Sequence, residues 1–149
     1  MIVVKSARAD APEFLPLHEA RTAYAKGLYP AESNHLLDLA SMCKPEMNFF
    51  GAWDGQEAVG CGGFWEYATY VEIKSMWVVP KARGQKIGRH LLEVVEREAA
   101  AKGYKIARLE TGIHQPEALA LYHKHGYREV GPFEDYKPDA LSVFMEKIL

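Results

Sequence analysis

The chain has 149 residues, 48% of them hydrophobic, which predicts one globular domain over residues 1–149 with a substantial core. Its 18 Lys and Arg residues against 20 Asp and Glu give a formal net charge of -2, so overall charge does not favour nucleic acid or an anionic membrane as a partner. The sequence shows no signal peptide and no apolar run of about 20 residues, and we expect a cytoplasmic protein. Cys43 and Cys61 lack metal-site spacing, and we expect two reduced thiols.

The first half of the chain predicts a strand, two helices and three further strands. Apolar residues recur at near-helical spacing after Pro12, and Tyr29-Pro30 interrupts that pattern. Asp54-Gly55 between two apolar runs indicates a hairpin. In chain order, the expected elements are a strand at 2–7, a helix at 12–28, a short helix at 33–43 with Ser33 as its N-cap, hairpin strands at 48–53 and 58–67, and a strand at 70–79.

The second half begins with a long amphipathic helix that ends at Gly103. A strand at 105–111, a short helix from Pro116 to Gly126, and strands at 127–130 and 141–148 follow. The expected apolar stripe of the long helix is Ile87, Leu91, Leu92, Val95 and Ala99, and its expected outward face is Arg89, Glu93, Glu96, Arg97 and Lys102.

The resulting order, β-α-α-β-β-β-α-β-α-β-β, predicts an α/β protein with a mixed sheet covered by helices. Because a long helix connects the strand at 70–79 to the strand at 105–111, these two strands should be parallel.

A basic turn precedes the long helix. The first turn of a helix presents unpaired backbone N–H groups and a partial positive charge, and glycines let a phosphate approach that backbone. Arg83-Gly84-Gln85-Lys86-Ile87-Gly88-Arg89 supplies these features, without being a Walker or a G-x-G-x-x-G motif. A phosphate site and a solvated turn whose basic residues face water both fit this pattern.

The segment Arg83-Gly84-Gln85-Lys86-Ile87-Gly88 resembles the Arg/Gln-x-x-Gly-x-Gly/Ala signature of the GNAT superfamily of N-acetyltransferases. The preceding "EIKSMWVVPKA" and the later "QPEALALYHKHGYREVG" are similar to the neighbouring strand and second helix of that family. The resemblance implies a sheet of about six to seven strands with a splayed parallel pair and about four helices. Lys86 replaces the first glycine of the signature; because a non-glycine residue disfavours positive φ, we expect helical backbone there.

The resemblance further implies acetyl-CoA as cosubstrate, no metal, and a small-molecule or peptide amine as acceptor, with dimers common in the family. The backbone from Arg83 to Arg89 would hold the pyrophosphate, and the strand residues Met76, Trp77 and Val78 would line the pantetheine arm. The N–H of Met76 would face the thioester carbonyl. Packing in the sheet is the alternative role for Met76 and Val78, and it is compatible with binding through their backbone atoms.

Two side chains are candidates for proton transfer. Glu72 lies four residues before Met76, which predicts the same strand face, and it resembles the catalytic glutamate of some family members; the alternative is a surface ion pair with Lys74. Tyr122 in "ALALYHKHGY" resembles the tyrosine that protonates the departing thiolate, and the alternative is a tyrosine packed between helix and sheet.

The remaining candidates surround these groups. Gln115 would either contact the pantetheine or cap the helix that follows it, and His123 and His125 are expected to be structural or solvated. Aromatic rings with carboxylates suit a cationic amine, although such rings also mark dimer interfaces. The residues expected on the acceptor side are Tyr29, Glu32, His35, Trp65, Glu66, Tyr67, Phe133 and Tyr136.

The expected function is therefore acetyl transfer from acetyl-CoA to a primary amine. The alternative is a module of the same fold that binds acyl-CoA without turnover, although such a module would need neither Glu72 nor Tyr122. A nucleotide-binding protein of another fold would require a Walker lysine-serine and an acidic metal-binding pair, which the sequence lacks.

Overall fold

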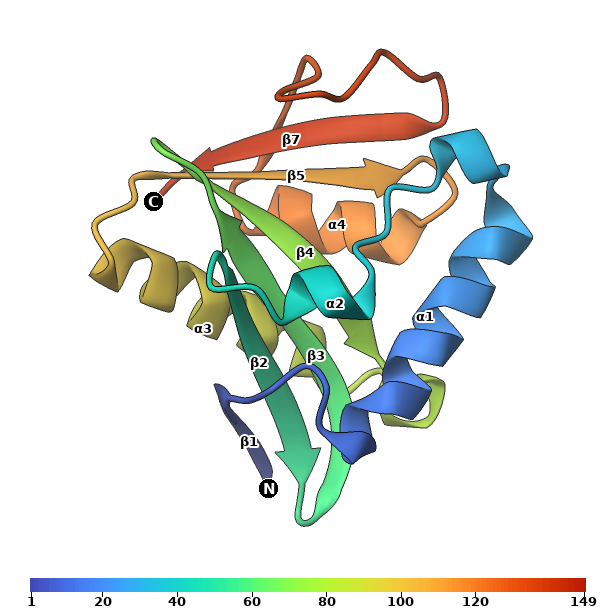
Figure 1. Ribbon diagram of the computed structural model, residues 1–149, viewed down its shortest axis with the longest axis vertical. Coiled ribbons are helices and arrows are strands. Elements are labelled where there is room, and N and C mark those ends of the chain that lie inside the picture. Colours follow the sequence, from blue (N-terminus) through green and yellow to red (C-terminus); the bar gives the residue numbers. More distant parts are fainter.

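The computed structural model describes residues 1–149, which form one seven-stranded sheet with helices on both of its faces (Figure 1). Short 3-10 turns occupy Pro12–Phe14, Ala31–Ser33 and Pro80–Ala82. The helices are α1 (Leu15–Leu28), α2 (Leu39–Met42), α3 (Ile87–Ala101) and α4 (Pro116–Lys124), and the strands are β1 (Ile2–Ser6), β2 (Met47–Asp54), β3 (Glu57–Glu66), β4 (Val71–Val78), β5 (Ile106–Gly112), β6 (Arg128–Val130) and β7 (Ser142–Ile148).

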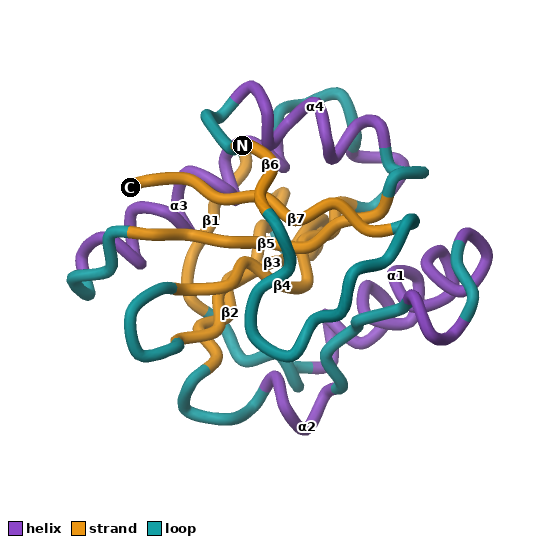
Figure 2. The backbone as a smooth tube through the Cα atoms, turned by 90° about the horizontal axis from the view of Figure 1, so that it is seen from above, coloured by secondary structure: helices purple, strands orange, loops and turns teal.

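The strand order is β1-β2-β3-β4-β5-β7-β6, and every neighbouring pair is antiparallel except β4 and β5. Seen from above, α1 and α2 cover one face of the sheet, whereas α3 and α4 cover the other (Figure 2). The mixed sheet, the parallel pair and the order of elements confirm the sequence prediction. No helix combines the length and the apolar character needed to cross a membrane.

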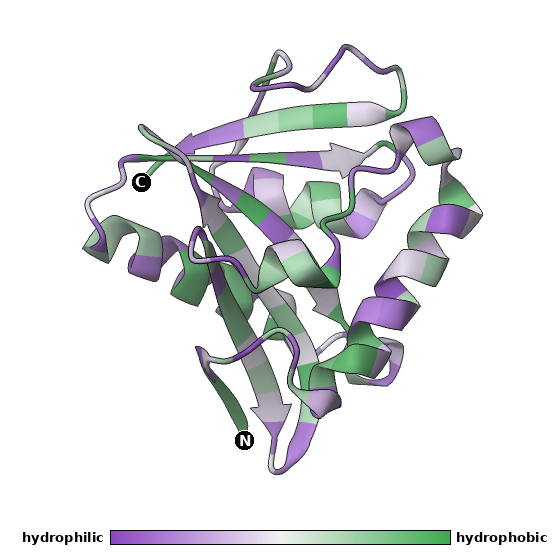
Figure 3. Cartoon of the chain, in the orientation of Figure 1, coloured by the Kyte–Doolittle hydropathy of each residue, from purple (hydrophilic) through white to green (hydrophobic).

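The apolar stripe of α3 forms the centre of the core. The five residues predicted from its spacing are buried, together with Val94, and along its ribbon hydrophobic segments alternate with hydrophilic ones (Figure 3). Glu96 differs from the prediction: it is half-buried and accepts hydrogen bonds from the Tyr127 hydroxyl at 2.8 Å and Lys147 Nζ at 2.7 Å. These contacts connect the last strand and the segment that follows α4 to α3, which the helix pattern alone could not indicate.

The two parallel strands separate soon after they meet. They pair only at Val71–Ala107 and Glu72–Arg108, and beyond these positions β4 and β5 diverge, as Figure 1 shows. The remainder of β4 keeps its partner β3 on the other side, so the edge of β4 that faces β5 is open from Ile73 onward. A splayed parallel pair of this kind provides space in the middle of the sheet.

A bulge in β4 reverses the direction of its later side chains. Cys61 pairs with Trp77 and Gly63 with Lys74, so two β4 residues oppose one β3 residue, and Ser75 has a φ of 63°. A bulge leaves its extra residue unpaired and breaks the alternation of faces. Met76 therefore packs against the core on the α3 side, with Ile73, while Glu72 lies on the α1 side. The prediction that Glu72 and Met76 share a face is wrong for this reason.

The second helix is also shorter than predicted. The sequence suggested residues 33–43 with Ser33 as N-cap, but α2 spans only Leu39–Met42 and its N-cap is Asp38, which accepts a hydrogen bond from the Ser41 N–H at 2.7 Å. Ser33 instead donates to Asp139 Oδ2 at 2.6 Å, a residue more than 100 positions away. Because its hydroxyl makes this long-range bond, Ser33 does not cap a helix.

Candidate functional site

A cavity of about 660 Å³ lies between the splayed ends of β4 and β5. Its floor is the β4 segment from Ile73 to Val78, with Glu110 to Gly112 of β5 beside it; helix α4 and the start of α3 form one wall, and α1 with residues 33–37 forms the other. This volume lies within the range of about 300–1,000 Å³ typical of ligand sites. Of the residues predicted for a coenzyme, the lining includes Met76, Trp77, Val78, Arg83, Gly84, Lys86, Ile87, Gly88, Arg89, Gln115 and Tyr122, and it omits Gln85.

One end of the cavity is formed by the turn that begins α3. Gly84 and Lys86 both have left-handed backbone, with φ of 86° and 62°, so the prediction of helical backbone at Lys86 is wrong. Lys86 is the N-cap, and its carbonyl accepts the first hydrogen bond of the helix from the N–H of His90. The backbone amides before His90 therefore have no partner within the helix. With Arg83, Lys86 and Arg89 around it, this helix start suits a phosphate group.

The left-handed backbone of Lys86 gives a prediction about stability. A side chain in this region costs about 1–2 kcal/mol that glycine avoids, part of which is offset by the greater freedom of glycine in the unfolded chain. We expect Lys86→Gly to raise the free energy of unfolding by up to about 1 kcal/mol, measured by urea denaturation. Lys86→Ala, which removes the charge but keeps the strain, is the control, and an equal gain in both variants would contradict this explanation.

Arg83 is held at the mouth of the cavity by two contacts. Its Nε donates to the carbonyl of Val78 at 3.0 Å, and its guanidinium lies 4.8 Å from the centre of the Trp77 ring. The Trp77 ring in turn contacts Tyr24 of α1, with a separation of 5.5 Å between ring centres. The Trp77 side chain thus positions Arg83 and joins β4 to α1.

Tyr122 of α4 lines the cavity. It is 6% exposed, its ring packs edge-on against Tyr127 at 5.6 Å, and no protein group bonds its hydroxyl. Burial is the main cause that raises the pKa of Tyr122 above its ordinary value, and the charge of Glu110 adds to the rise. The phenol is therefore protonated at neutral pH and free to donate to a ligand.

Gln115 stands at the N-cap position of α4, yet its side chain makes no capping hydrogen bond. Its Oε1 instead accepts from the Gly112 N–H at 3.2 Å and from the Tyr29 hydroxyl at 3.3 Å. A side chain on Gly112 would overlap the Tyr29 ring, so glycine is required for this close approach. Gln115 and Tyr29 together fix the end of β5 against α1.

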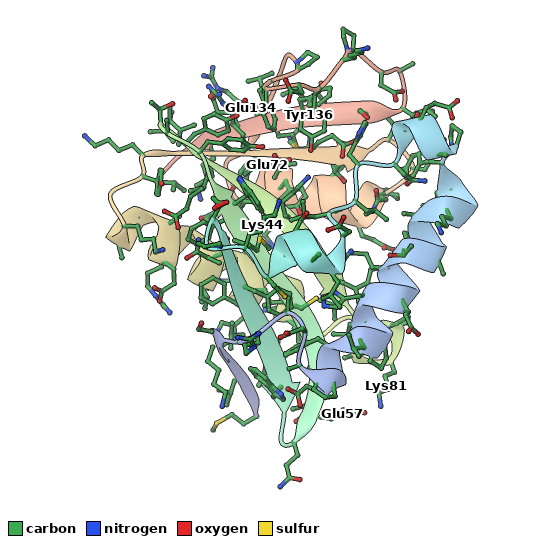
Figure 4. All side chains as sticks on the ribbon, viewed as in Figure 1. Lys44, Glu57, Glu72, Lys81, Glu134 and Tyr136 are labelled. Carbon is green, nitrogen blue, oxygen red and sulfur yellow. The ribbon has the colours of Figure 1, made fainter.

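Glu72 does not line the cavity, although its neighbours Ile73 and Lys74 do. It is 2% exposed, and its Oε2 accepts from the hydroxyl of Tyr136 at 2.6 Å; both residues are labelled in Figure 4. The same oxygen lies 3.2 Å from Lys74 Nζ. The Tyr67 hydroxyl approaches its Oε1 at 3.5 Å. The pair with Lys74 considered from the sequence is present, but it is buried rather than on the surface.

Two carboxylates line the cavity, Glu110 of β5 and Glu117 of α4. Glu117 is exposed, whereas Glu110, which the sequence analysis did not single out, is half-buried. Glu110 lies on β5, and its pKa is raised mainly by burial, an effect that the Ser142 hydroxyl and, to a lesser degree, the charge of Lys74 oppose only in part. The sequence offered one signal, an acidic residue near the carboxyl end of a strand that is otherwise partly buried. Glu110 lines the cavity only because β4 and β5 are no longer paired at this point of the sheet.

The residues expected on the acceptor side are divided by the structure. Tyr29 and His35 line the cavity, whereas Glu32, Trp65, Tyr67 and Tyr136 do not. Tyr67 stacks on Tyr70 at 4.9 Å, and Phe133 and Tyr136, in the loop between β6 and β7, pack on one another at 5.2 Å. The contact of Tyr70 with Phe133 joins the two pairs into one cluster. The carboxylate of Glu66 accepts hydrogen bonds from the side chains of Asn48, Lys102 and Tyr104.

Comparison with known proteins agrees with this geometry. The model of the acetyltransferase (GNAT) family matches residues 14–127. An IAA acetyltransferase of Azospirillum brasilense is 49% identical over 135 residues, covering 89% of this chain and 88% of the relative. A Klebsiella pneumoniae protein assigned as an acyl-CoA N-acyltransferase has a TM-score of 0.85 at 34% identity, covering 100% and 98% of the two chains.

A PaiA N-acetyltransferase of Thermoplasma acidophilum, solved in complex with coenzyme A, has a TM-score of 0.76 at 20% identity, covering 100% of this chain and 99% of that one, and shares the fold. The family match and the 49% identical relative extend this likeness from fold to activity. With the open β4 edge and the free amides at the start of α3, they identify the chain as a GNAT-family N-acetyltransferase that uses acetyl-CoA.

Proposed function

We propose that the protein transfers the acetyl group directly from acetyl-CoA to a primary amine, with both substrates bound in the cavity between β4 and β5. The observation that carries this proposal is the continuity of the cavity, which runs from the basic start of α3 past Tyr122 to Glu110 and α1. A single chamber allows the two reactants to meet without a covalent enzyme intermediate, which suits direct attack.

The residues of the basic turn would bind the coenzyme. Backbone amides from Arg83 to Arg89 would hold its pyrophosphate, and the open edge of β4 at Met76 and Val78 would bind its pantetheine as a further strand does. The bulge at Ser75 supports a role for the Met76 N–H as the donor facing the thioester carbonyl, because a bulge frees backbone groups from the ladder. When bound, acetyl-CoA supplies the activated acetyl thioester.

Glu110 is assigned as the general base. An amine must lose a proton to attack, and a carboxylate whose pKa is raised by burial is a better proton acceptor than an ordinary one. Glu72 was the candidate from the sequence, but both of its oxygens lie close to other side chains and it does not line the cavity. Its role in this scheme is to hold Lys74 and Tyr136 in place.

Tyr122 is assigned as the donor to the leaving sulfur. As the amine nitrogen forms its bond to the acetyl carbon, the carbon–sulfur bond breaks and the sulfur gains charge. A hydrogen bond or proton from the free Tyr122 hydroxyl would stabilise that charge, while Glu110 takes the proton of the amine.

The test measures binding and turnover separately. Calorimetry with coenzyme A should give binding that Gly88→Glu, which places a negative charge at the start of α3, reduces at least tenfold. Thiol release from acetyl-CoA should then depend on added amine. Binding without amine-dependent thiol release would contradict catalysis and leave a coenzyme-binding module, and absence of binding would overturn the proposal entirely.

A further inference from the structure

Arg21 of α1 is a buried cation in the cavity wall. It is 7% exposed, it contributes to the lining of the cavity, and it forms none of the ion pairs of the structure. Its Nε is buried without any hydrogen-bond partner. A guanidinium cannot lose its proton in practice, so its charge persists in this position.

The groups that surround Arg21 are neutral. The Nε2 of His18 lies 2.9 Å from the carbonyl oxygen of Ala9, which can only accept, so this nitrogen carries the ring proton. Its Nδ1 then accepts from Arg21 Nη1 at 3.3 Å. Burial lowers the pKa of His18, which keeps the ring neutral at neutral pH.

Cys61, the other neighbour of Arg21, does not supply a negative charge either. Its thiol is 0% exposed, and burial raises its pKa to about 12, so it remains protonated. Its Sγ lies 3.5 Å from the Ser75 carbonyl, which places the Arg21 environment next to the bulge of β4. Arg21, which lines the cavity, thus lies close to the segment of β4 at which the proposed transfer takes place.

A buried charge without a counterion is unfavourable unless a ligand supplies one. The phosphates of the coenzyme already have suitable partners in Arg83, Lys86 and Arg89 at the start of α3. Arg21 belongs to the opposite wall, with Tyr24 and His35, whose Nε2 is also buried without a partner. The anion that would neutralise Arg21 is therefore expected on the acceptor rather than on the coenzyme phosphates.

We propose that Arg21 binds a carboxylate of the acceptor, so that the substrate is an amino acid or another amine that also carries a carboxylate. This inference rests on the proposed function. It replaces the small cationic amine suggested by the aromatic and acidic residues of the sequence, because most of those residues lie outside the cavity. Glu110 then interacts with the amine of the acceptor, and Arg21 binds its carboxylate.

The test compares acceptors that differ only in the carboxylate. Free amino acids, including aromatic ones, and their carboxamides are assayed by thiol release from acetyl-CoA. We expect kcat/KM at least tenfold higher for the acid than for its carboxamide, mainly through KM. Arg21→Met, close in volume, should remove this preference, while Arg21→Lys should keep part of it. Lys26→Met removes an exposed charge from the same helix and is the control. It should leave kcat/KM unchanged for both the acid and the carboxamide.

Four outcomes would overturn the inference. Carboxamides that react as well as the acids, or an Arg21→Met variant that retains the preference, would show that Arg21 binds no acceptor carboxylate while leaving the proposed function intact. Faster transfer from succinyl-CoA than from acetyl-CoA onto carboxamides, lost in Arg21→Met, would place the carboxylate on the acyl group. A protein that releases no thiol with any amine would overturn the proposed function as well. The acid-to-carboxamide comparison in the unaltered protein holds even if a variant fails to fold.

Discussion

Glu110→Gln is expected to lower kcat by a factor of about 100 to 10,000, the usual contribution of general acid–base catalysis. Glutamine keeps the shape of the side chain on β5 but cannot accept a proton from the amine. The structural reason for choosing this residue is that Glu110 lines the cavity and burial raises its pKa. Steady-state assays of thiol release with the best acceptor measure the effect.

The pH profile gives a second readout for the same residue. Because only the ionised carboxylate can act as a base, kcat/KM should fall as the pH is lowered through the pKa of Glu110. That pKa is raised in the folded protein, so the acid limb should lie above the ordinary carboxyl value of 4.5 and should be absent in Glu110→Gln.

Glu72→Gln is the matched comparison on the neighbouring strand. It leaves Lys74 without its buried partner, so we expect a loss of about 1–3 kcal/mol in the free energy of unfolding and a change in kcat of less than tenfold. If Glu72→Gln abolished turnover in a folded protein and Glu110→Gln did not, the base would be Glu72, as the sequence suggested, acting through a relay.

Tyr122→Phe is expected to lower kcat at least tenfold, and about 100-fold if the phenol transfers a full proton. The substitution removes only an oxygen atom that no protein group bonds, so the fold and the affinity for coenzyme A should be unchanged. Thermal unfolding and calorimetry with coenzyme A check these two expectations, and thiol release measures kcat.

Tyr127→Phe provides the control for Tyr122. Tyr127 packs against Tyr122 at 5.6 Å, but its hydroxyl bonds Glu96 at 2.8 Å and it does not line the cavity. Its loss should reduce stability by about 1 kcal/mol and leave kcat within a factor of two or three. Equal losses of kcat in both variants would show that packing, rather than the Tyr122 hydroxyl, is responsible.

The sequence by itself determined the order of the elements and their main boundaries. Strong local signals account for this: the apolar runs on both sides of the hairpin turn at Asp54-Gly55, the apolar stripe of α3 and the glycine at 103 each act within a few residues. The same holds for the basic turn before α3, whose free amides follow from its position at the start of a helix.

The tertiary structure decided which side chains meet in the cavity. The bulge at Ser75 moves Met76 to the face opposite Glu72, and Lys86 adopts left-handed backbone. Glu110 and Arg21 line the same cavity only because β4 and β5 separate and α1 packs over the gap. The shared cavity depends on contacts between residues far apart in the chain, so local periodicity and propensity carry no record of it.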